Sequence, residues 1–257
     1  MKISATVITF NEEANITAAL ESLRWADEIV VVDSESTDKT VEIARRYTDR
    51  VFVRPWPGYS AQKSFASEQA ENDWIFNLDA DERVSDQLAL EIERLKASAG
   101  VTASGFEVPR LTYYLGRWIR HSGWYPDYKL RLYNRNAGGW RGDYVHESVQ
   151  VTGRVERLAG EILHYTVRNS SDHHLRLDRY TTLAARERFA RGKRATTLSM
   201  LLSPVAAFLR SYIVKRGFLD GTQGLAISVF AAHYVFLKNL KLWEMEREES
   251  PEGKIRP

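Results

Sequence analysis

The sharpest chemical signal in the sequence is a set of acidic residues that follows an apolar run. The run Asp-Ala-Asp-Glu at residues 79–82 comes directly after residues 74–78 (WIFNL), which are typical of a buried strand. Because the chain turns where a strand ends, one carboxylate can face a sugar or ribose while another faces a cation. Mg²⁺ and Mn²⁺ prefer such oxygen ligands and keep coordination positions open for a diphosphate. The alternative is that these acids only cap the following helix.

Two further polar clusters end apolar runs nearer the amino terminus. Residues 9–12 end the run ISATVITF, and residues 33–36 end the run EIVVVD. Both runs are rich in β-branched residues, as expected for buried parallel strands. Because ligands of open parallel sheets bind beyond the carboxyl ends of the strands, we expect all three clusters at one edge. This convergence favours a ligand site over helix capping.

The elements that must position these clusters follow from the periodicity of the first hundred residues. Strands are expected at residues 3–10, 28–33, 51–53 and 74–78, and helices from Glu12 and at 39–47, 59–70 and 85–99. This alternation predicts an α/β domain with an open, mostly parallel sheet. Residues 105–148 are rich in aromatic side chains and arginine, and they suggest antiparallel additions that make the sheet mixed. Beyond Ser170 the pattern becomes helical.

The composition excludes several kinds of chemistry. The 257 residues are 44% hydrophobic and 27% charged, with a net charge of +2, which is typical of a folded soluble protein. The chain has no cysteine, which excludes disulfides, zinc–thiolate sites, iron–sulfur clusters and thiol catalysis. The amino terminus lacks a long apolar core and a cleavage site, so we expect no secretory signal and a cytoplasmic amino end.

Several motifs together resemble the family 2 glycosyltransferases. They are TFNEE at residues 9–13, VVVDSESTDKT at 30–40, Gln62-Lys63 and NLDADE at 77–82. The stretch GWYPDYKLRLYNR, with YVHE at 144–147, is similar to the branch of β-1,4-glucosyltransferases that act on heptose in the lipopolysaccharide core. The resemblance implies a Rossmann-like GT-A catalytic domain over residues 1–170 that binds a nucleotide sugar. It leaves residues 171–257 as a helical extension.

The resemblance implies a role for each polar cluster. The nucleotide sugar would be bound by Thr9, Asn11, Glu12, Asp33, Gln62, Lys63 and Asp79. Asp33 would accept a hydrogen bond from the base or ribose, although many relatives have two adjacent acids where this chain has Asp33-Ser34. Asp81 and His164 would bind the divalent metal, Mg²⁺ or Mn²⁺. Without the family, Lys63 would be a solvated helix lysine and His164 a strand histidine held by a backbone hydrogen bond.

An inverting transfer needs a base, an exposed anomeric carbon and a stabilised diphosphate leaving group. The resemblance implies Glu147 as the base, with Asp143 as the second candidate. The alternative for both is a helix cap. His146 would contact substrate or orient its neighbours, or simply pack in the fold.

Aromatic and charged residues in the middle of the chain could hold a phosphorylated acceptor. Aromatic rings stack on sugars, and an arginine can bind a phosphate with two parallel hydrogen bonds. We therefore expect Trp124, Asp127, Arg131 and His146 to bind the acceptor. The alternative is that the aromatic rings belong to the core and that Arg131 lies on a surface strand.

The charge is distributed unevenly along the chain. Residues 168–217 contain 11 Lys and Arg against 3 Asp and Glu, a balance of +8, which leaves −6 for the rest of the chain. Apolar runs lie at residues 198–214, broken by Pro204 and Arg210, and at 225–237, and neither reaches the roughly 20 uninterrupted residues of a spanning helix. Basic and apolar features side by side predict helices that lie on an anionic membrane surface. The alternative is a hairpin packed on the catalytic domain or on a second subunit of a homo-oligomer.

These observations predict a metal-dependent inverting glycosyltransferase that is peripheral on the inner face of the cytoplasmic membrane. The resemblance implies that it moves a hexose, glucose above all, from a UDP-sugar to a lipid-linked saccharide such as the lipopolysaccharide core. No recognition motif accompanies the basic residues, so no nucleic acid partner is expected. One alternative is a nucleotidyltransferase acting on a sugar phosphate, but residues 9–13 are not its glycine- and arginine-rich phosphate loop. Another is a membrane-associated nucleotide-binding scaffold without catalysis, against which Asp79, Asp81 and Glu147 argue.

Overall fold

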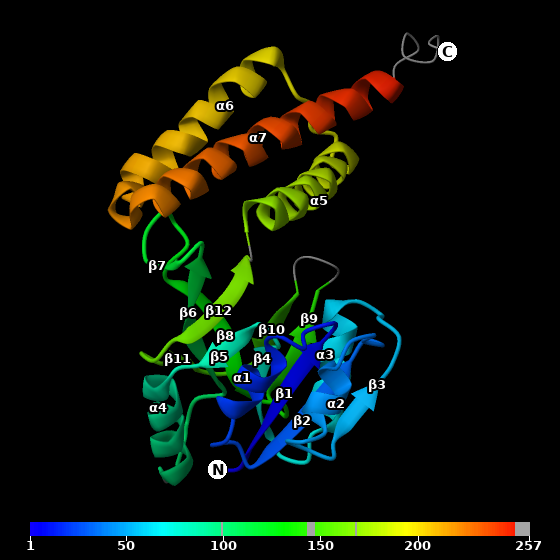
Figure 1. The fold of residues 1–257 in the computed structure, drawn as a ribbon, viewed down its shortest axis with the longest axis vertical. Coiled ribbons are helices and arrows are strands. Elements are labelled where there is room, and N and C mark those ends of the chain that lie inside the picture. Colours follow the sequence, from blue (N-terminus) through cyan, green and yellow to red (C-terminus); the bar gives the residue numbers. More distant parts are fainter. Residues whose placement is uncertain (99, 143–146, 168, 250–257) are drawn as a thin grey trace. The chain divides into compact units, whose positions relative to one another are not determined.

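The protein consists of two compact units in a computed structural model that describes residues 1–98, 100–142, 147–167 and 169–249 (Figure 1). The sheet unit comprises residues 1–111 and 126–166, and the helical unit comprises residues 112–125 and 167–257. The sequence places one boundary near residue 170. The structure differs in giving residues 112–125 to the helical unit, because they bind residues that follow them by about a hundred positions.

The sheet unit is built on a mixed sheet, as the sequence predicts. Its strands run in the order β3-β2-β1-β4-β8-β6-β12-β5. Their bounds are β1 Ile3–Thr9, β2 Glu28–Asp33, β3 Val51–Val53, β4 Trp74–Asp79, β5 Glu82–Val84, β6 Gly105–Tyr114, β8 Asp127–Asn134 and β12 Ile162–Val167. The first four strands are parallel, whereas β8 is antiparallel to both β4 and β6. β11 (Val155–Arg157) pairs with β6, and β9 (Gly138–Arg141) pairs with β10 (Ser148–Val151) as a separate ribbon.

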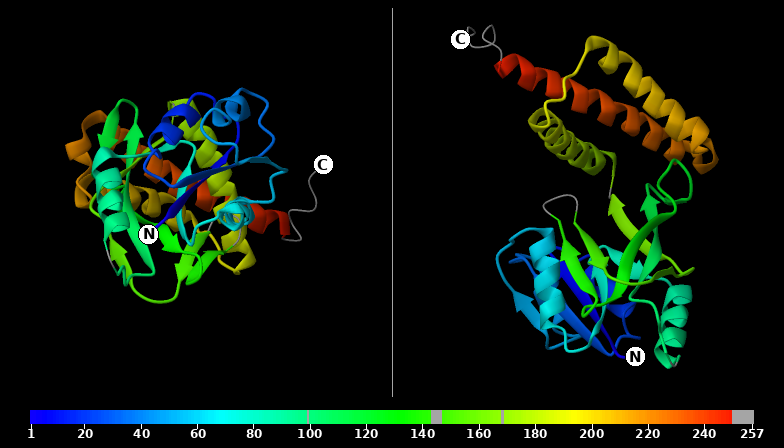
Figure 2. Two further views of the ribbon diagram at one scale, coloured as in Figure 1. Left: turned by 90° about the horizontal axis from the view of Figure 1, so that it is seen from below. Right: turned by 180° about the vertical axis from the view of Figure 1, so that it is seen from behind.

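The central strands are buried because helices pack against the sheet. All seven residues of β1 are buried, although its sequence ISATVIT includes three hydroxyl side chains. The helices are α1 Ile16–Glu21, α2 Thr40–Ala44, α3 Tyr59–Gln69 and α4 Asp86–Ala97 (Figure 2). The side chain of Ser85 caps α4 by accepting a hydrogen bond from the backbone N–H of Leu88. The helix expected from Glu12 begins only at Ile16, because residues 11–15 form a loop bound to the segment after β2.

Three helices dominate the helical unit: α5 Ser170–Ala190, α6 Thr197–Leu209 and α7 Gly221–Glu249. Asn169 caps α5, and a reciprocal pair of hydrogen bonds between Thr196 and Ser199 begins α6. A π-helical turn, η1 (Arg210–Val214), and a 3-10 turn, η2 (Gly217–Asp220), join α6 to α7. Both α5 and α6 pack along α7 (Figures 1 and 2). The unit also contains β7 (Arg117–Ile119), which pairs with the end of β6.

The helical unit contains longer apolar helices than the sequence predicts. Among the described residues, Thr197–Val214 and Gly217–Glu248 could each cross a membrane, judged by length and composition alone. Pro204 lies inside α6 without ending it, and the π turn carries the helix past Arg210. η2 likewise runs directly into α7. Pro204 and Arg210 interrupt the apolar run in the sequence, but they do not end the helical structure.

Candidate active site

The three polar clusters meet at one edge of the sheet, which confirms their predicted convergence. In the β1–β2 pair, Thr9 lies opposite Asp33, and in the β1–β4 pair, Ile8 lies opposite Asp79. The carboxyl ends of β1, β2 and β4 are therefore side by side (Figure 1). The candidate active site is built on this edge, where open parallel sheets bind their ligands.

The loops after β1 and β2 are tied together by hydrogen bonds. The backbone N–H of Asn11 donates to Ser36 Oγ at 2.8 Å, and Asn11 Oδ1 accepts from the N–H of Thr37 at 2.8 Å. The N–H of Glu12 donates to Thr40 Oγ1 at 2.8 Å. Asn11 has a φ of 52°, a left-handed conformation that asparagine tolerates better than most residues. Asn11 and Glu12 thus shape the rim of the site with their backbone as well as their side chains.

Asp33 lies inside this loop structure. Its side chain is fully buried, and its two oxygens accept hydrogen bonds from the N–H and the hydroxyl of Ser36. Gln62, also fully buried on α3, donates from Nε2 to Ser34 Oγ at 3.1 Å. The N–H of Ser34 donates to the carbonyl oxygen of Thr9. These bonds connect α3 with the ends of β1 and β2.

Buried polar atoms without partners gather at the same edge. In the described part of the chain, Thr9 Oγ1, Gln62 Oε1 and His164 Nδ1 are buried and have no hydrogen-bond partner. Thr9 is 5% exposed and Gln62 is 0% exposed. Because buried polar groups in native proteins are nearly always satisfied, such atoms indicate a place where a polar ligand completes the structure.

A chain of alternating charges runs beneath the site. Lys63 Nζ lies 2.9 Å from Asp79 Oδ1, and Arg131 Nη2 lies 3.2 Å from Asp79 Oδ2. Arg131 Nη2 also donates to both oxygens of Glu82, at 2.6 and 2.7 Å. Arg131 Nη1 donates to Asn77 Oδ1. The side chains of Lys63, Arg131 and Glu82 are at most 5% exposed. Asp79 is thereby fixed in place by two cations.

These charges set the protonation of the buried groups. Burial by itself would raise the pKa of Asp79, but the charges of Lys63 and Arg131 outweigh it and hold this pKa well below its usual range. Burial likewise opposes the charge of Arg131, yet Glu82 and Asp79 outweigh it and raise the pKa of the guanidinium. Asp79 and Arg131 are therefore both charged.

The structure gives Arg131 a different place from the one expected of an acceptor-binding residue. Arg131 is only 3% exposed, and both of its Nη atoms bind inside the protein. Asp127, also expected at the acceptor, accepts from Arg110 at 2.7 Å and lies 3.0 Å from Lys129 Nζ. Burial works against the charge of Asp127, but Arg110 and Lys129 hold its pKa below the usual range.

Asp81 and His164 form the part of the site that fits a divalent cation. His164 Nε2 lies 3.4 Å from Asp81 Oδ2, and the two side chains are 12% and 21% exposed. Pairing of β5 with β12 sets this position, since His164 lies opposite Glu82 and the N–H of Tyr165 donates to the Asp81 carbonyl oxygen. Imidazole nitrogen and carboxylate oxygen suit Mn²⁺, and the carboxylate also suits Mg²⁺.

The protein by itself offers few ligands to such a cation. Within the described ranges, no three His, Cys, Asp or Glu side chains gather closely enough to form a metal site. Two protein ligands still suffice for a cation that takes its remaining ligands from water and a diphosphate, as Mg²⁺ usually does in nucleotide enzymes. The residues present therefore fit a cation that binds together with a nucleotide.

The remaining expected residues are placed as follows. Glu147 is half-buried and directly precedes β10, whereas Asp143 and His146 lie outside the described residues. Trp124 belongs to the helical unit, where its ring contacts those of Tyr114 and His173 with centroids 5.4 and 6.2 Å apart. Its surroundings match the alternative that Trp124 packs in a core.

Sequence reasoning included Glu82 in the acidic run 79–82 without giving it a role, and it missed Arg110 as part of the site. Glu82 is fully buried at the centre of the charge network, and Arg110 Nη1 lies 3.3 Å from its Oε1. The signal available in the sequence was Arg110 within the strand-like run FEVPRL, since a charged side chain in a largely buried strand needs a partner.

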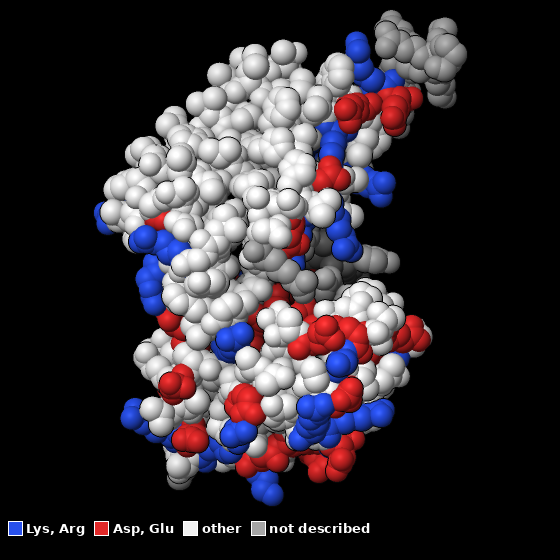
Figure 3. All heavy atoms as spheres, in the orientation of Figure 1, with Lys and Arg blue, Asp and Glu red and all other residues white. Residues whose placement is uncertain are grey.

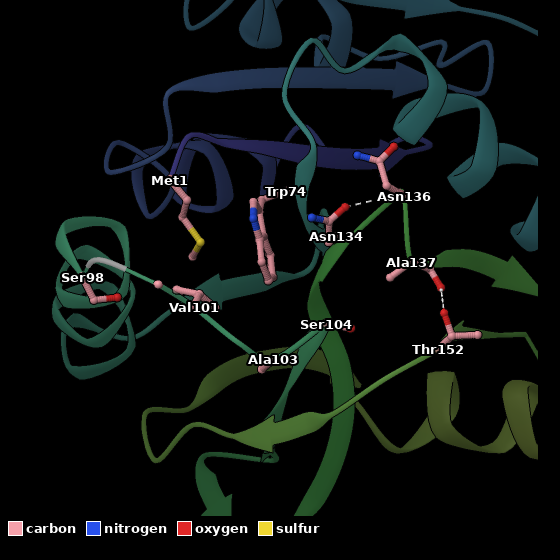
Figure 4. Close-up of a pocket in the computed structure, with 11 residues that line it drawn as sticks. Met1, Trp74, Ser98, Val101, Ala103, Ser104, Asn134, Asn136, Ala137 and Thr152 are labelled. Atoms are coloured by element: carbon pink, nitrogen blue, oxygen red, sulfur yellow. Dashed lines mark hydrogen bonds between the residues drawn. The ribbon is translucent and has the colours of Figure 1, made fainter.

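A cavity of about 620 Å³ lies at the other edge of the sheet, near the amino ends of β1 and β4 (Figure 4). Met1, Trp74, Asn134, Asn136 and Thr152 are among its lining residues. None of the described residues that line it has a charged side chain. It is therefore separate from the carboxylate cluster, and its lining presents no carboxylate or basic side chain.

Comparison with known proteins identifies the family. Residues 4–149 match the family model described as Glycosyl transferase family 2. The lipopolysaccharide core biosynthesis glycosyltransferase LpsC of Rhizobium meliloti is 33% identical over 251 residues, which cover 95% of this chain and 93% of LpsC. An uncharacterized glycosyltransferase of Rickettsia typhi is 32% identical over 255 residues, covering 95% of this chain and 87% of the relative.

Solved structures are consistent with this assignment at the level of the fold. The mannosyltransferase PcManGT from Pyrobaculum calidifontis, in complex with GDP-Man and Mn²⁺, is similar with a TM-score of 0.54 and 17% identity. The alignment covers 95% of this chain and 87% of PcManGT. Together with the matched family model, these findings show that the chain belongs to glycosyltransferase family 2 and is a glycosyltransferase with the GT-A fold.

Proposed function

We propose that this glycosyltransferase moves a hexose, glucose above all, from a UDP-sugar to a lipid-linked saccharide with inversion at the anomeric carbon. The observation that carries the proposal is the Asp81–His164 pair, at the sheet edge where Thr9 and Gln62 leave buried polar atoms unpartnered. Similarity to LpsC supports an acceptor of the lipopolysaccharide core. The Mn²⁺ in the PcManGT complex supports a divalent cation.

The donor would be held along the ends of β1, β2 and β4. Thr9 Oγ1 and Gln62 Oε1 would bond the base or ribose, with Asn11 and Glu12 at the rim. Asp33 would contribute indirectly, by holding the loop that contains Ser36. Its carboxylate already accepts hydrogen bonds from the N–H and the hydroxyl of Ser36.

Lys63 and Asp79 would form the floor of the diphosphate site. Lys63 supplies positive charge, while its bond to Asp79 fixes the carboxylate that follows β4. We assign Arg131 to the same floor as a positioning residue, since its guanidinium is buried against Asp79 and Glu82. This arrangement leaves Asp81 as the carboxylate free to face a cation.

The transfer itself would use Asp81, His164 and Glu147. Asp81 and His164 would hold Mg²⁺ or Mn²⁺, which when bound offsets the negative charge of the leaving diphosphate. Glu147 would accept the proton of the acceptor hydroxyl while the hydroxyl oxygen attacks the anomeric carbon on the side opposite the diphosphate. Asp143 is the second candidate base, and His146 would contact the substrate.

The acceptor would meet Asp127 in the sheet unit. Asp127 keeps a 33% exposed side chain and could accept a hydrogen bond from a sugar hydroxyl. The lipid-linked nature of this acceptor would place the enzyme on the inner face of the cytoplasmic membrane, as a peripheral protein.

A turnover screen tests this function. Purified protein is incubated with UDP-glucose, UDP-galactose, UDP-GlcNAc or GDP-mannose, each with Mn²⁺, Mg²⁺ or EDTA, and the released nucleotide is measured. We expect release of UDP from UDP-glucose in the presence of a divalent cation. Release only from GDP-mannose would contradict the donor, and equal release in EDTA would contradict the role of the metal.

A further inference from the structure

Helix α6 exposes an apolar stripe instead of burying it. Leu198, Leu201, Leu202, Val205 and Leu209 are 65%, 63%, 59%, 56% and 49% exposed. At 100° per residue these positions fall within an arc of about 100°, which is the width of the face that a helix of a globular protein usually turns to the core. No residue of α6 is buried. The stripe therefore lacks a covering partner among the described residues.

The exposed apolar surface extends over the turns and onto α7. In η1 and η2, Ile213, Val214 and Phe218 are 53%, 71% and 47% exposed. On α7, Leu225 and Val229 are 42% and 52% exposed. We call the exposed apolar residues of α6, η1, η2 and α7 the apolar face. In Figure 3 the surface over α6 and α7 is a broad area without acidic or basic side chains.

Basic residues border the apolar face at both ends of α6. Residues 197–209 and 221–237 contain no charged side chain. Arg191, Lys193 and Arg194 precede α6, Arg210 and Lys215 follow it, and all five residues are exposed. Apolar residues enclosed by cations match the chemistry of an anionic bilayer, in which acyl chains lie beneath negative head groups.

Each uncharged segment is shorter than the hydrocarbon core of a bilayer is thick. At 1.5 Å per residue, residues 197–209 extend about 20 Å and residues 221–237 about 26 Å, against roughly 30 Å of hydrocarbon. A spanning hairpin would also place its tip, residues 210–220, on the far side of the membrane from the ends of its helices.

The tip is instead held by polar contacts to residues 112–125 within the helical unit. Asp220, only 2% exposed, accepts from the N–H of His121 at 2.9 Å and from the N–H of Arg120 at 3.3 Å. Gln223 Nε2 donates to the Leu115 carbonyl oxygen at 2.9 Å. The opposite end of α7 is held to α5, where Lys241 Nζ lies 2.6 Å from Asp178 Oδ1. Both ends of α7 are thus anchored on polar parts of one unit.

We propose that the apolar face docks on an anionic lipid bilayer with α6 parallel to the membrane plane, inserted on one side without spanning it. This inference deepens the proposed function, since it names the surface that would bring the enzyme to a lipid-linked acceptor. The apolar face enters the boundary between head groups and acyl chains, while Arg191, Lys193, Arg194, Arg210 and Lys215 contact the phosphates.

Flotation with vesicles tests the docking surface. The full chain, without donor or metal, is mixed with vesicles of phosphatidylcholine alone or with 30% phosphatidylglycerol, a composition chosen to supply negative charge. We expect strong binding only to anionic vesicles. The affinity for these vesicles should fall at least tenfold in the double variant Leu201→Gln with Val205→Gln. It should fall about fivefold in each of the single variants Lys193→Gln and Arg210→Gln. The matched control, Leu175→Gln with Leu183→Gln, removes two exposed apolar residues from α5 and should bind as the wild type does. Equal binding by both double variants would overturn the proposal, as would a dimer in free solution that only the α6 variant dissociates.

The absence of cysteine allows a direct test of the in-plane orientation. Leu202→Cys carries an environment-sensitive dye on the apolar face, and Arg216→Cys marks the tip of the hairpin. We expect the dye at residue 202 to report an apolar environment on anionic vesicles, and residue 216 to react with an impermeant thiol reagent added outside. Protection of residue 216 in intact vesicles would show a spanning hairpin and overturn the proposal. Asp81→Asn should keep vesicle binding, so failure of the donor chemistry and failure of docking are distinguished.

Discussion

Because of the ion pairs beneath the site, we expect substitutions of Asp79 and Asp81 to affect the stability of the sheet unit differently. Asp79 is held by Lys63 and Arg131, whereas Asp81 has His164 Nε2 at 3.4 Å. We therefore expect Asp79→Asn to destabilise the sheet unit and Asp81→Asn to leave its stability nearly unchanged. The two substitutions are chemically identical and two residues apart, so each serves as the control for the other.

The magnitude follows from what Asp79→Asn leaves behind. The Lys63 side chain is 5% exposed, and its ammonium would lose the negative charge that lies 2.9 Å away. Removing one partner of a buried ion pair costs about 3–5 kcal/mol. Arg131 keeps both oxygens of Glu82, and asparagine still offers a carbonyl oxygen, so the lower end applies. A loss of about 3 kcal/mol corresponds to a melting temperature lower by about 6–12 °C for a unit of this size.

Urea unfolding followed by tryptophan fluorescence measures both variants. We expect Asp79→Asn to unfold at a clearly lower urea concentration. Asp81→Asn should lose less than about 1 kcal/mol, because Asp81 contacts a single imidazole at 3.4 Å whereas Asp79 contacts two nearly buried cations. If Asp79→Asn has the wild-type midpoint, or if both variants lose equal stability, Asp79 is not the fixed carboxylate of the site and the reasoning fails.

Three further predictions concern the base, a half-buried histidine and a helix cap. Glu147→Gln should lower the rate of transfer by about 10²- to 10⁴-fold and leave UDP affinity unchanged; a loss of UDP affinity would instead indicate a role in donor binding. Burial lowers the pKa of His173, which lies against Tyr114 and Phe230, so its share of the stability is complete above about pH 6.5 and is lost as the pH falls below it. The melting temperature of His173→Gln should therefore vary less between pH 7 and pH 5 than that of the wild type; parallel pH curves would contradict this. Ser85→Ala should lower the free energy of unfolding by about 1 kcal/mol, and an unchanged value would show that the cap does not stabilise α4.

The elements of the sheet unit were predictable because their patterns are local. Buried parallel strands favour apolar residues, and the largely apolar runs that end at Asp33 and Asp79 match the observed strands within a residue. The convergence of their polar ends then follows from the geometry of parallel sheets. The edge that carries the site could therefore be located from the sequence alone.

The contacts within the site depend on partners that the sequence does not bring together. An arginine in a strand can face solvent or a buried carboxylate, and the Glu82 that binds Arg131 lies 49 residues earlier in the chain. The same holds for the helical unit, where His121 binds Asp220 across 99 positions. Local patterns identify which residues are polar, but tertiary contacts decide which of them remain available for a ligand.

Calorimetric titration of UDP into the protein tests directly whether a divalent cation at Asp81 and His164 is needed to hold the nucleotide diphosphate. We expect the wild type to bind UDP in Mn²⁺, and to lose this binding both in EDTA and in the folded Asp81→Asn variant. Equal UDP affinity in Mn²⁺, in EDTA and in Asp81→Asn would contradict the account.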